Sequence, residues 1–115
     1  MVFIVGGAYQ GKMTYAEDNF PDYVVINGYQ SIVREELKKG LDSFAELDKR
    51  LLLHISEYGS LDKLVVISDE VGYGVVPVDE FERKFRETNG RINCRLAETS
   101  ETVIRVVCGI GEKIK

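Results

Sequence analysis

The chain has 115 residues, of which 30% are charged and 44% hydrophobic, and its formal net charge is −4. This length and composition predict one globular domain spanning residues 1–115. The acidic balance disfavours nucleic acid as a general partner. No apolar run approaches the roughly 20 residues that are needed to cross a bilayer. We therefore expect a cytoplasmic protein without a nucleic-acid or membrane partner.

The first half of the sequence alternates between strand and helix signals. The apolar run Val2–Val5 predicts a buried strand rather than a signal peptide, because no basic region precedes it. A helix is expected over residues 12–19, since Pro21 prevents its continuation. A second strand is expected over residues 23–26, and a second helix is expected to begin at a Ser31 cap and to end at Gly40.

The second half continues the same alternation. A helix is predicted from Asp42 or Ser43 to residue 59, and the continuous apolar run at residues 64–67 is typical of a strand covered on both faces. A loop follows over residues 71–77. A helix capped by Asp79 is expected to break at Asn89-Gly90 and to restart over residues 91–98. The last predicted strand covers residues 102–108.

Together these elements predict an α/β fold, a three-layer parallel sheet of four strands flanked by helices, like that of P-loop NTPases. Ligands on such sheets bind beyond the carboxyl ends of the strands. Three of the predicted strand ends carry glycine or polar residues, namely Gly6-Gly7, Ser68-Asp69-Glu70 and Gly109. We expect these three ends to converge at one edge of the sheet.

The segment that follows the first strand has the spacing of a phosphate-binding loop. Gly6 is separated by four residues from Gly11-Lys12, which is the pattern G-x-x-x-x-G-K between a strand and a helix. Glycines let main-chain N–H groups surround phosphate oxygens, and the lysine adds a positive charge near the outer phosphates. The alternative is a glycine-rich turn that binds nothing. The predicted nucleotide-binding residues are Gly6, Gly7, Ala8, Tyr9, Gln10, Gly11, Lys12, Met13 and Thr14.

The metal-binding part of this pattern is incomplete. The residue after the lysine is Met13, where the motif has a serine or threonine hydroxyl for Mg²⁺, and a thioether is a poor ligand for that ion. Thr14 carries a hydroxyl, but its side chain is rotated by about 100° around the helix axis from that of Met13. Asp69 and Glu70 follow a buried strand, where a carboxylate could hold Mg²⁺ directly or through water. We assign the metal role to Asp69 and catalytic roles to Lys12 and Glu70. A cap or a surface charge is the alternative for both acids.

An arginine pair, the histidine and the two cysteines are the other candidates for chemistry. Arg91 and Arg95 share a helix face and could clamp a phosphate, with Arg91 as the predicted nucleotide contact. The alternative is a solvated face paired with acids such as Glu87. His54 is the one histidine of the chain, and a helix-surface or partly buried imidazole is the favoured interpretation. The two cysteines, Cys94 in a predicted helix and Cys108 in a predicted strand, lack metal-ligand spacing and are expected to be buried free thiols.

Several separated motifs resemble one family, the bifunctional adenosylcobinamide kinase/adenosylcobinamide-phosphate guanylyltransferases. The resemblance includes the loop Gly6 to Lys12. It continues in three later segments, which are Val65 to Pro77, Phe85 to Ala97 and the tail Val107-Cys108-Gly109-Ile110-Gly111 with Lys113. The family phosphorylates the aminopropanol arm of adenosylcobinamide with a nucleoside triphosphate. It then transfers GMP from GTP through a guanylylated histidine.

The resemblance implies a P-loop fold, GTP or ATP as the bound nucleotide, a cobinamide-type corrinoid as the second substrate and a tendency to form homo-oligomers. The chain departs from the family at Met13, at Asp69, where the family usually has asparagine, and over residues 29–59, where no residue matches the guanylylated-histidine motif. We therefore expect a nucleotide-binding protein of cobalamin biosynthesis that leans towards a phosphotransferase and lacks the histidine-guanylylation step. The sequence leaves open whether Mg²⁺ is bound. The alternative is a non-catalytic nucleotide-binding regulator or partner protein.

Overall fold

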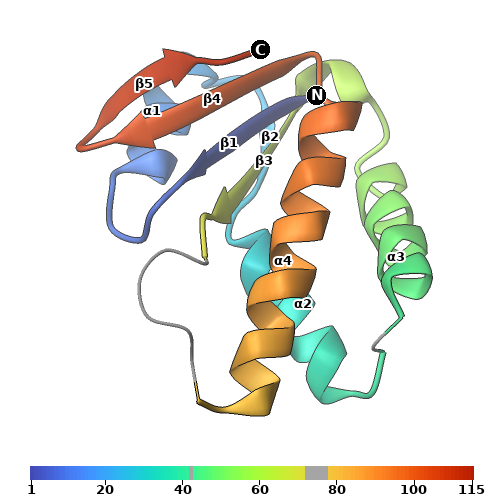
Figure 1. Cartoon of the computed structure of the whole chain (residues 1–115). Helices are drawn as coiled ribbons and strands as arrows, with labels where there is room; N and C mark the ends of the chain where they lie inside the picture. The colour runs from blue at the N-terminus through green and yellow to red at the C-terminus, as the bar shows by residue number, and fades with distance from the viewer. Residues whose placement is uncertain (42, 72–77) are drawn as a thin grey trace.

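The computed structural model describes residues 1–41, 43–71 and 78–115. Asp42, one of the two predicted helix starts, and residues 72–77 of the predicted loop over 71–77 lie outside this description. The elements in chain order (Figure 1) are β1 (Val2–Gly6), α1 (Lys12–Asn19), β2 (Val24–Ile26), α2 (Tyr29–Lys38), α3 (Phe44–Ser56), the 3-10 turn η1 (Leu61–Lys63), β3 (Leu64–Asp69), α4 (Glu80–Thr99), β4 (Thr102–Val107) and β5 (Ile110–Lys113).

The strands form one sheet in the order β2-β3-β1-β4-β5. The pairs β2–β3, β3–β1 and β1–β4 are parallel, so β1, which leads into the glycine-rich segment, lies in the middle of the sheet. The predicted all-parallel sheet of four strands is wrong in one respect, because β5 adds an antiparallel edge. The turn between β4 and β5 consists of Cys108 and Gly109 with φ of 50° and 77°, the left-handed geometry of a tight hairpin.

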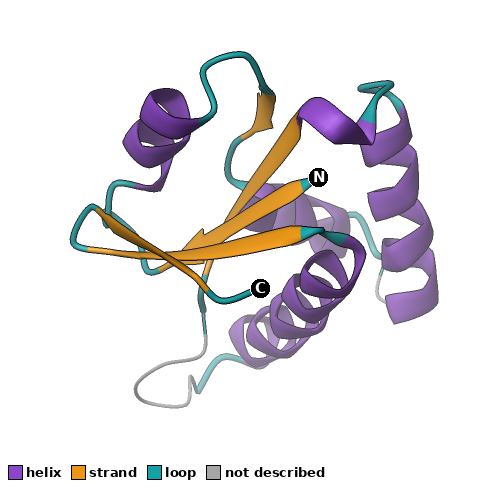
Figure 2. Cartoon of the chain, turned by 90° about the horizontal axis from the view of Figure 1, so that it is seen from above, coloured by secondary structure: helices purple, strands orange, loops and turns teal. Residues whose placement is uncertain are grey.

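The sheet lies between two layers of helices, which Figure 2 shows from above. Alternate side chains of β1 point to opposite faces. Phe3 and Val5 join a large core with α2, α3 and α4, whereas Val2 and Ile4 join a smaller core under α1. This confirms the predicted three-layer α/β architecture. The single helix α1 covers one face, and the other face carries the remaining three helices of the described chain.

Helix α4 differs from the prediction because it continues through Asn89 and Gly90. Its buried side chains Phe85, Ile92 and Leu96 all pack into the large core, and this tertiary packing outweighs the cost of about 1 kcal/mol for a glycine inside a helix. Helix α2 begins at Tyr29, two residues before the predicted Ser31 cap, after Gly28 in the left-handed region.

Both cysteines are free and exposed, so the prediction of buried thiols is wrong. Cys94 lies on the outer side of α4, and Cys108 lies in the hairpin turn rather than in the strand. In the three described ranges, no helix is both long enough and apolar enough to cross a membrane.

Candidate phosphate-binding site

The carboxyl ends of β1 and β3 and the β4–β5 turn meet at one edge of the sheet, as the sequence predicted. Gly6 at the end of β1 is paired with Asp69 at the end of β3, and the main-chain N–H of Gly109 donates to the carbonyl of Gln10 over 2.7 Å. The loop between Gly6 and Lys12 therefore crosses the top of the central strand. It leads directly into the first turn of α1.

Two glycines of this loop are required by its geometry. A Cβ at Gly6 would lie 2.4 Å from the main-chain oxygen of Val106 in β4, which the sheet holds in place. Gly11 has a φ of 87°, a conformation that side chains oppose, and a Cβ there would lie 3.4 Å from the Cα of Gly109. The loop backbone thus fits tightly between β4 and the hairpin turn. Steric limits alone therefore require glycine at these two positions, whether or not the loop contacts phosphate.

Lys12, the first residue of α1, is 93% buried, since its exposed fraction is 7%. Its Nζ donates to the carbonyl oxygen of Gly7 over 2.6 Å and lies 2.7 Å from Oδ1 of Asp69. A buried ammonium group needs such partners, because desolvation without them costs several kcal/mol. The lysine is therefore folded back across its own loop, with its charge held at the end of β3.

Three side-chain amides hold the main chain of Asp69. Its N–H donates to Oε1 of Gln30 over 3.0 Å, and its carbonyl oxygen accepts from Nδ2 of Asn89 and of Asn93, each over 3.2 Å. The two asparagines are one helical turn apart on α4, and Gln30 belongs to α2. Helices on one face of the sheet thus fix the strand end whose carboxylate pairs with Lys12. We call these three residues the amide cradle.

The amide cradle includes buried atoms without partners. Oδ1 of Asn89 and Oδ1 of Asn93 are buried and, like Oγ of the neighbouring Ser68, have no hydrogen-bond partner among the described residues. Each such group costs about 1–3 kcal/mol of stability, so proteins keep few of them.

A cavity of about 300 Å³ opens beside Lys12. One wall is the phosphate-loop segment, and the opposite wall is the connection from β2 to α2. The lining residues are Tyr9, Gln10, Gly11, Lys12, Met13, Thr14, Asn27, Gly28, Gln30 and Asp69. Six of the predicted nucleotide-binding residues, 9–14, are therefore brought to one cavity with the predicted metal ligand Asp69.

The β4–β5 hairpin braces the outer end of the loop. Gln10 accepts two hydrogen bonds from it, one from the N–H of Cys108 to Oε1 and one from the N–H of Gly109 to the main-chain oxygen, both over 2.7 Å. A Cβ at Gly111 would lie 2.2 Å from the ring of Tyr15, so α1 also packs closely on β5. The antiparallel strand that the sequence analysis missed therefore supports the loop.

Glu70, the predicted catalytic acid, lies beside the loop but outside the cavity at Lys12. Its N–H donates to the oxygen of Gly6 over 2.8 Å, and its carboxylate pairs with Arg105 of β4 at 3.4 Å. These two side chains line a separate cavity of about 240 Å³ with Gly7 and Gln10. The catalytic role of Glu70 stays a prediction.

The structure does not bring Arg91 to the cavity at Lys12. Its guanidinium lies 3.4 Å from Glu87 and 6.0 Å from the ring centre of Phe44 in α3. The neighbouring Arg95 donates to Asp48 of α3 over 2.9 Å and also pairs with Glu98. This is the solvated, acid-paired face that the sequence analysis held as the alternative to a phosphate clamp.

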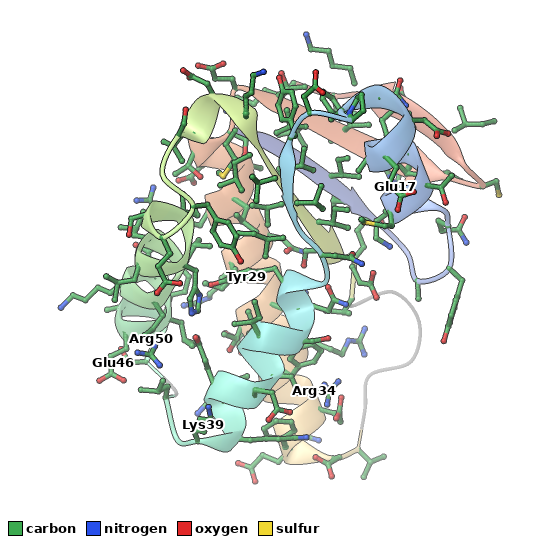
Figure 3. The ribbon with its side chains drawn as sticks, turned by 180° about the vertical axis from the view of Figure 1, so that it is seen from behind. Glu17, Tyr29, Arg34, Lys39, Glu46 and Arg50 are labelled. Atoms are coloured by element: carbon green, nitrogen blue, oxygen red, sulfur yellow. The ribbon has the colours of Figure 1, made fainter. Side chains whose placement is uncertain are left out.

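His54 is partly buried, as favoured by the sequence, and lies between α3 and α2. Its Nδ1 is 3.0 Å from the hydroxyl of Tyr29, and its Nε2 is 3.6 Å from the buried carboxylate of Glu36. Figure 3 shows Tyr29 in the first turn of α2 and Arg50 on α3, from the face opposite to Figure 1. Burial, reinforced by Glu36, raises the pKa of Tyr29 well above its usual range. The imidazole contributes to a polar contact between two helices and does not line the phosphate cavity.

Gln30, Asn27 and Asn89 belong to the site but were not predicted from the sequence. Asn27 follows β2 at the same sheet edge, so its position at a strand end was a usable signal. Gln30 and Asn89 gave none, because their roles depend on how α2 and α4 pack against β3. Within the described residues, no group of three or more His, Cys, Asp or Glu side chains is placed to hold a metal ion.

The central strand, the glycine loop, the buried lysine and the acidic end of the neighbouring strand define a phosphate-loop protein. Comparison with known families is more specific. The model of the family described as cobinamide kinase / cobinamide phosphate guanyltransferase matches residues 21–114, and the chain belongs to this family. The match begins after the phosphate loop, so the family and the loop geometry are independent observations.

Two curated relatives carry the name bifunctional adenosylcobalamin biosynthesis protein CobU. The protein of Salmonella typhimurium (strain LT2) is 49% identical over 53 residues, and that of Escherichia coli (strain K12) is 47% identical over 53 residues. In both cases the match covers 46% of this chain and 29% of the relative. The chain thus aligns with less than a third of the length of these curated relatives.

Proposed function

We propose that this protein binds the triphosphate of GTP or ATP in the cavity at Lys12 and transfers the terminal phosphoryl group to a cobinamide-type acceptor. The observation that carries the proposal is the buried Nζ of Lys12, held between the loop carbonyl of Gly7 and the carboxylate of Asp69 at the edge of the cavity. A phosphate entering this cavity offers the ammonium group a stronger partner than a carbonyl oxygen. The family supports both the nucleotide and the acceptor class.

The chemistry requires little covalent participation from the protein. The acceptor hydroxyl oxygen forms a bond to the terminal phosphorus, the bond to the bridging oxygen breaks, and the nucleoside diphosphate leaves with the electron pair. The hydroxyl proton passes to a base, for which the carboxylate of Glu70 is the candidate. Catalysis of this kind depends on positioning and on charge stabilisation. Lys12 supplies charge, and the main-chain N–H groups of the loop orient the phosphates.

A magnesium ion would fit this site with a reduced set of protein ligands. Asp69 is the one predicted ligand that lines the cavity, and its Oδ1 is already paired with Lys12. Mg²⁺ keeps several waters and accepts one or two carboxylates together with substrate phosphates, so the second carboxylate oxygen is sufficient. When bound, the ion would neutralise charge on the phosphate oxygens. Met13 contributes no oxygen to it.

We do not extend the proposal to guanylyl transfer through histidine. The one histidine of the sequence, His54, has its Nδ1 at the hydroxyl of Tyr29 and lines another cavity, between α2 and α3. A covalent role at the phosphate cavity would require an imidazole that faces it.

The test is transfer of label from γ-labelled GTP and ATP to adenosylcobinamide, with α-labelled GTP in parallel. The proposal predicts transfer of the γ label and none of the α label. Lys12→Ala should abolish the transfer, whereas Lys63→Ala, a surface control in η1, should not change it. Nucleotide binding without γ transfer would contradict the kinase proposal and leave a nucleotide-binding module.

A further inference from the structure

Gln30 lines the cavity but lies outside the phosphate-loop motif. It lies in the first turn of α2, on the wall opposite the phosphate loop. Its Oε1 accepts the main-chain N–H of Asp69 over 3.0 Å. Since an N–H group must meet an oxygen, this bond fixes which end of the side-chain amide faces Asp69.

The other end of the amide is consequently a donor directed away from Asp69. Nε2 of Gln30 lies 3.7 Å from the position that a Cβ would take on Gly28, another residue of the cavity wall. Within the described part of the chain, Nε2 makes no hydrogen bond. Gly28 has no side chain to occupy the space in front of it. A pair of N–H groups is therefore presented next to the cavity.

The position of this donor relative to Lys12 suggests what it binds. Gln30 and Lys12 contact the same residue, the first through the main-chain N–H of Asp69 and the second through its Oδ1 at 2.7 Å. The lysine of a phosphate loop meets the outer phosphates. A terminal phosphate that contacts Lys12 in a cavity of about 300 Å³ is thereby placed between the loop and the Gln30 wall.

We propose that Gln30 contacts the terminal phosphate of the bound nucleotide, with Nε2 as donor and Oε1 anchored on Asp69. This inference rests on the proposed nucleotide binding and adds a residue that distinguishes a triphosphate from a diphosphate. A diphosphate is held by the loop and Lys12 alone. A triphosphate gains one further hydrogen bond to a charged oxygen, and the same amide ties that contact to the strand end carrying Asp69.

The experiment measures the affinities of GTP and GDP, with ATP and ADP in parallel, for the wild-type chain and for two variants. Gln30→Met keeps the side-chain volume. It removes the observed bond to the N–H of Asp69 and the proposed bond to the phosphate. Gln30→Glu keeps an oxygen for the N–H of Asp69 and removes the donor. Both variants should lower the ratio of triphosphate to diphosphate affinity about tenfold, the size expected for one hydrogen bond to a charged group.

Asn27→Asp is the charge control, because it adds a negative charge to the same wall and leaves Gln30 unchanged. It should change the ratio much less than Gln30→Glu. Circular dichroism melting shows whether each variant folds. An unchanged ratio in Gln30→Met overturns the inference. So does a lowered ratio in Gln30→Met with a normal one in Gln30→Glu, since that result assigns Gln30 to the support of Asp69 alone. A wild-type chain that binds neither nucleotide refutes the proposed function itself, which is a separate outcome.

Discussion

Nζ of Lys12 lies 2.7 Å from Oδ1 of Asp69, and this ion pair joins the phosphate loop to the end of the adjacent strand. The lysine is 7% exposed and the aspartate side chain 25%, so the pair is shielded from water. A carboxylate in this position competes with phosphate for the same ammonium group. The pair therefore joins the loop to β3 and, under the proposed function, also opposes nucleotide entry.

Asp69→Asn should separate these two effects. Without ligand, the variant loses stability, because the ammonium group of Lys12 keeps only neutral oxygen partners, at a cost of about 1–3 kcal/mol. Without Mg²⁺, the affinity of the variant for GTP should be higher than that of the wild type, since the phosphate no longer competes with the carboxylate. Thermal melting with and without GTP in EDTA measures both effects. A smaller melting shift with GTP in the variant than in the wild type would contradict the competition.

Met13→Thr restores the hydroxyl that phosphate loops offer to Mg²⁺. Met13 lines the cavity and also packs against the small core under α1, so a modest loss of stability is expected. We predict that Mg²⁺ strengthens GTP binding more in this variant than in the wild type, by about tenfold for one added ligand interaction. Titration calorimetry with Mg²⁺ and with EDTA provides the comparison. Thr14→Val serves as control, because it tests whether the existing hydroxyl already serves the ion.

The amide cradle predicts non-additive effects at Asn89 and Asn93. Each donates to the carbonyl of Asp69 over 3.2 Å, so a single Asn→Leu change leaves the other donor in place. It also removes an oxygen that has no partner in the described part of the chain. The double variant leaves that carbonyl without either donor. We expect the double variant to be less stable than the sum of the single changes by about 1–2 kcal/mol. Urea unfolding of the four chains gives the coupling, and simple additivity would exclude the shared bond.

The close approach of β4 to the loop predicts that Gly6→Ala is severe. The added Cβ meets the main-chain oxygen of Val106, which cannot move without breaking the pairing of β1 and β4. Gly111→Ala meets the ring of Tyr15 instead, and a side chain can rotate away. We expect a loss of about 1–3 kcal/mol or more for Gly6→Ala. A second change, Tyr15→Ala, should rescue Gly111→Ala, and melting temperatures report both. A Gly6→Ala chain as stable as the wild type would refute the geometry.

The central layers of the fold could be predicted from the sequence, because buried parallel strands read as continuous apolar runs and the glycines mark the turns. Strand β5 could not, since its sequence Ile-Gly-Glu-Lys has little strand propensity and forms only by pairing with β4. The prediction of a helix break at Asn89-Gly90 is wrong for a related reason. Local propensity is overridden there by the burial of Phe85 and Ile92 and by the bond from Asn89 to Asp69.

In the candidate site, as in the fold, the residues marked by a local sequence pattern could be predicted and those placed by tertiary packing could not. The spacing of Gly6, Gly11 and Lys12 and the acid at a strand end are local patterns, and the structure brings Lys12 and Asp69 together. Gln30 and Asn89 reach the site only through packing of helices on the sheet, so no local pattern marks them. Arg91 had a suitable charge and spacing but faces α3, because the apolar side of α4 fixes which residues turn away from the sheet.

The central claim is that the cavity at Lys12 binds the phosphates of a nucleotide. Isothermal titration of GTP and ATP into the wild-type chain and into Lys12→Ala, with and without Mg²⁺, tests it most directly. Saturable binding to the wild type, at least about tenfold weaker in Lys12→Ala, is the predicted result for a lost charge-assisted contact. Equal affinity in the two chains, or no binding at about 1 mM nucleotide, the upper end of usual substrate KM values, would contradict it.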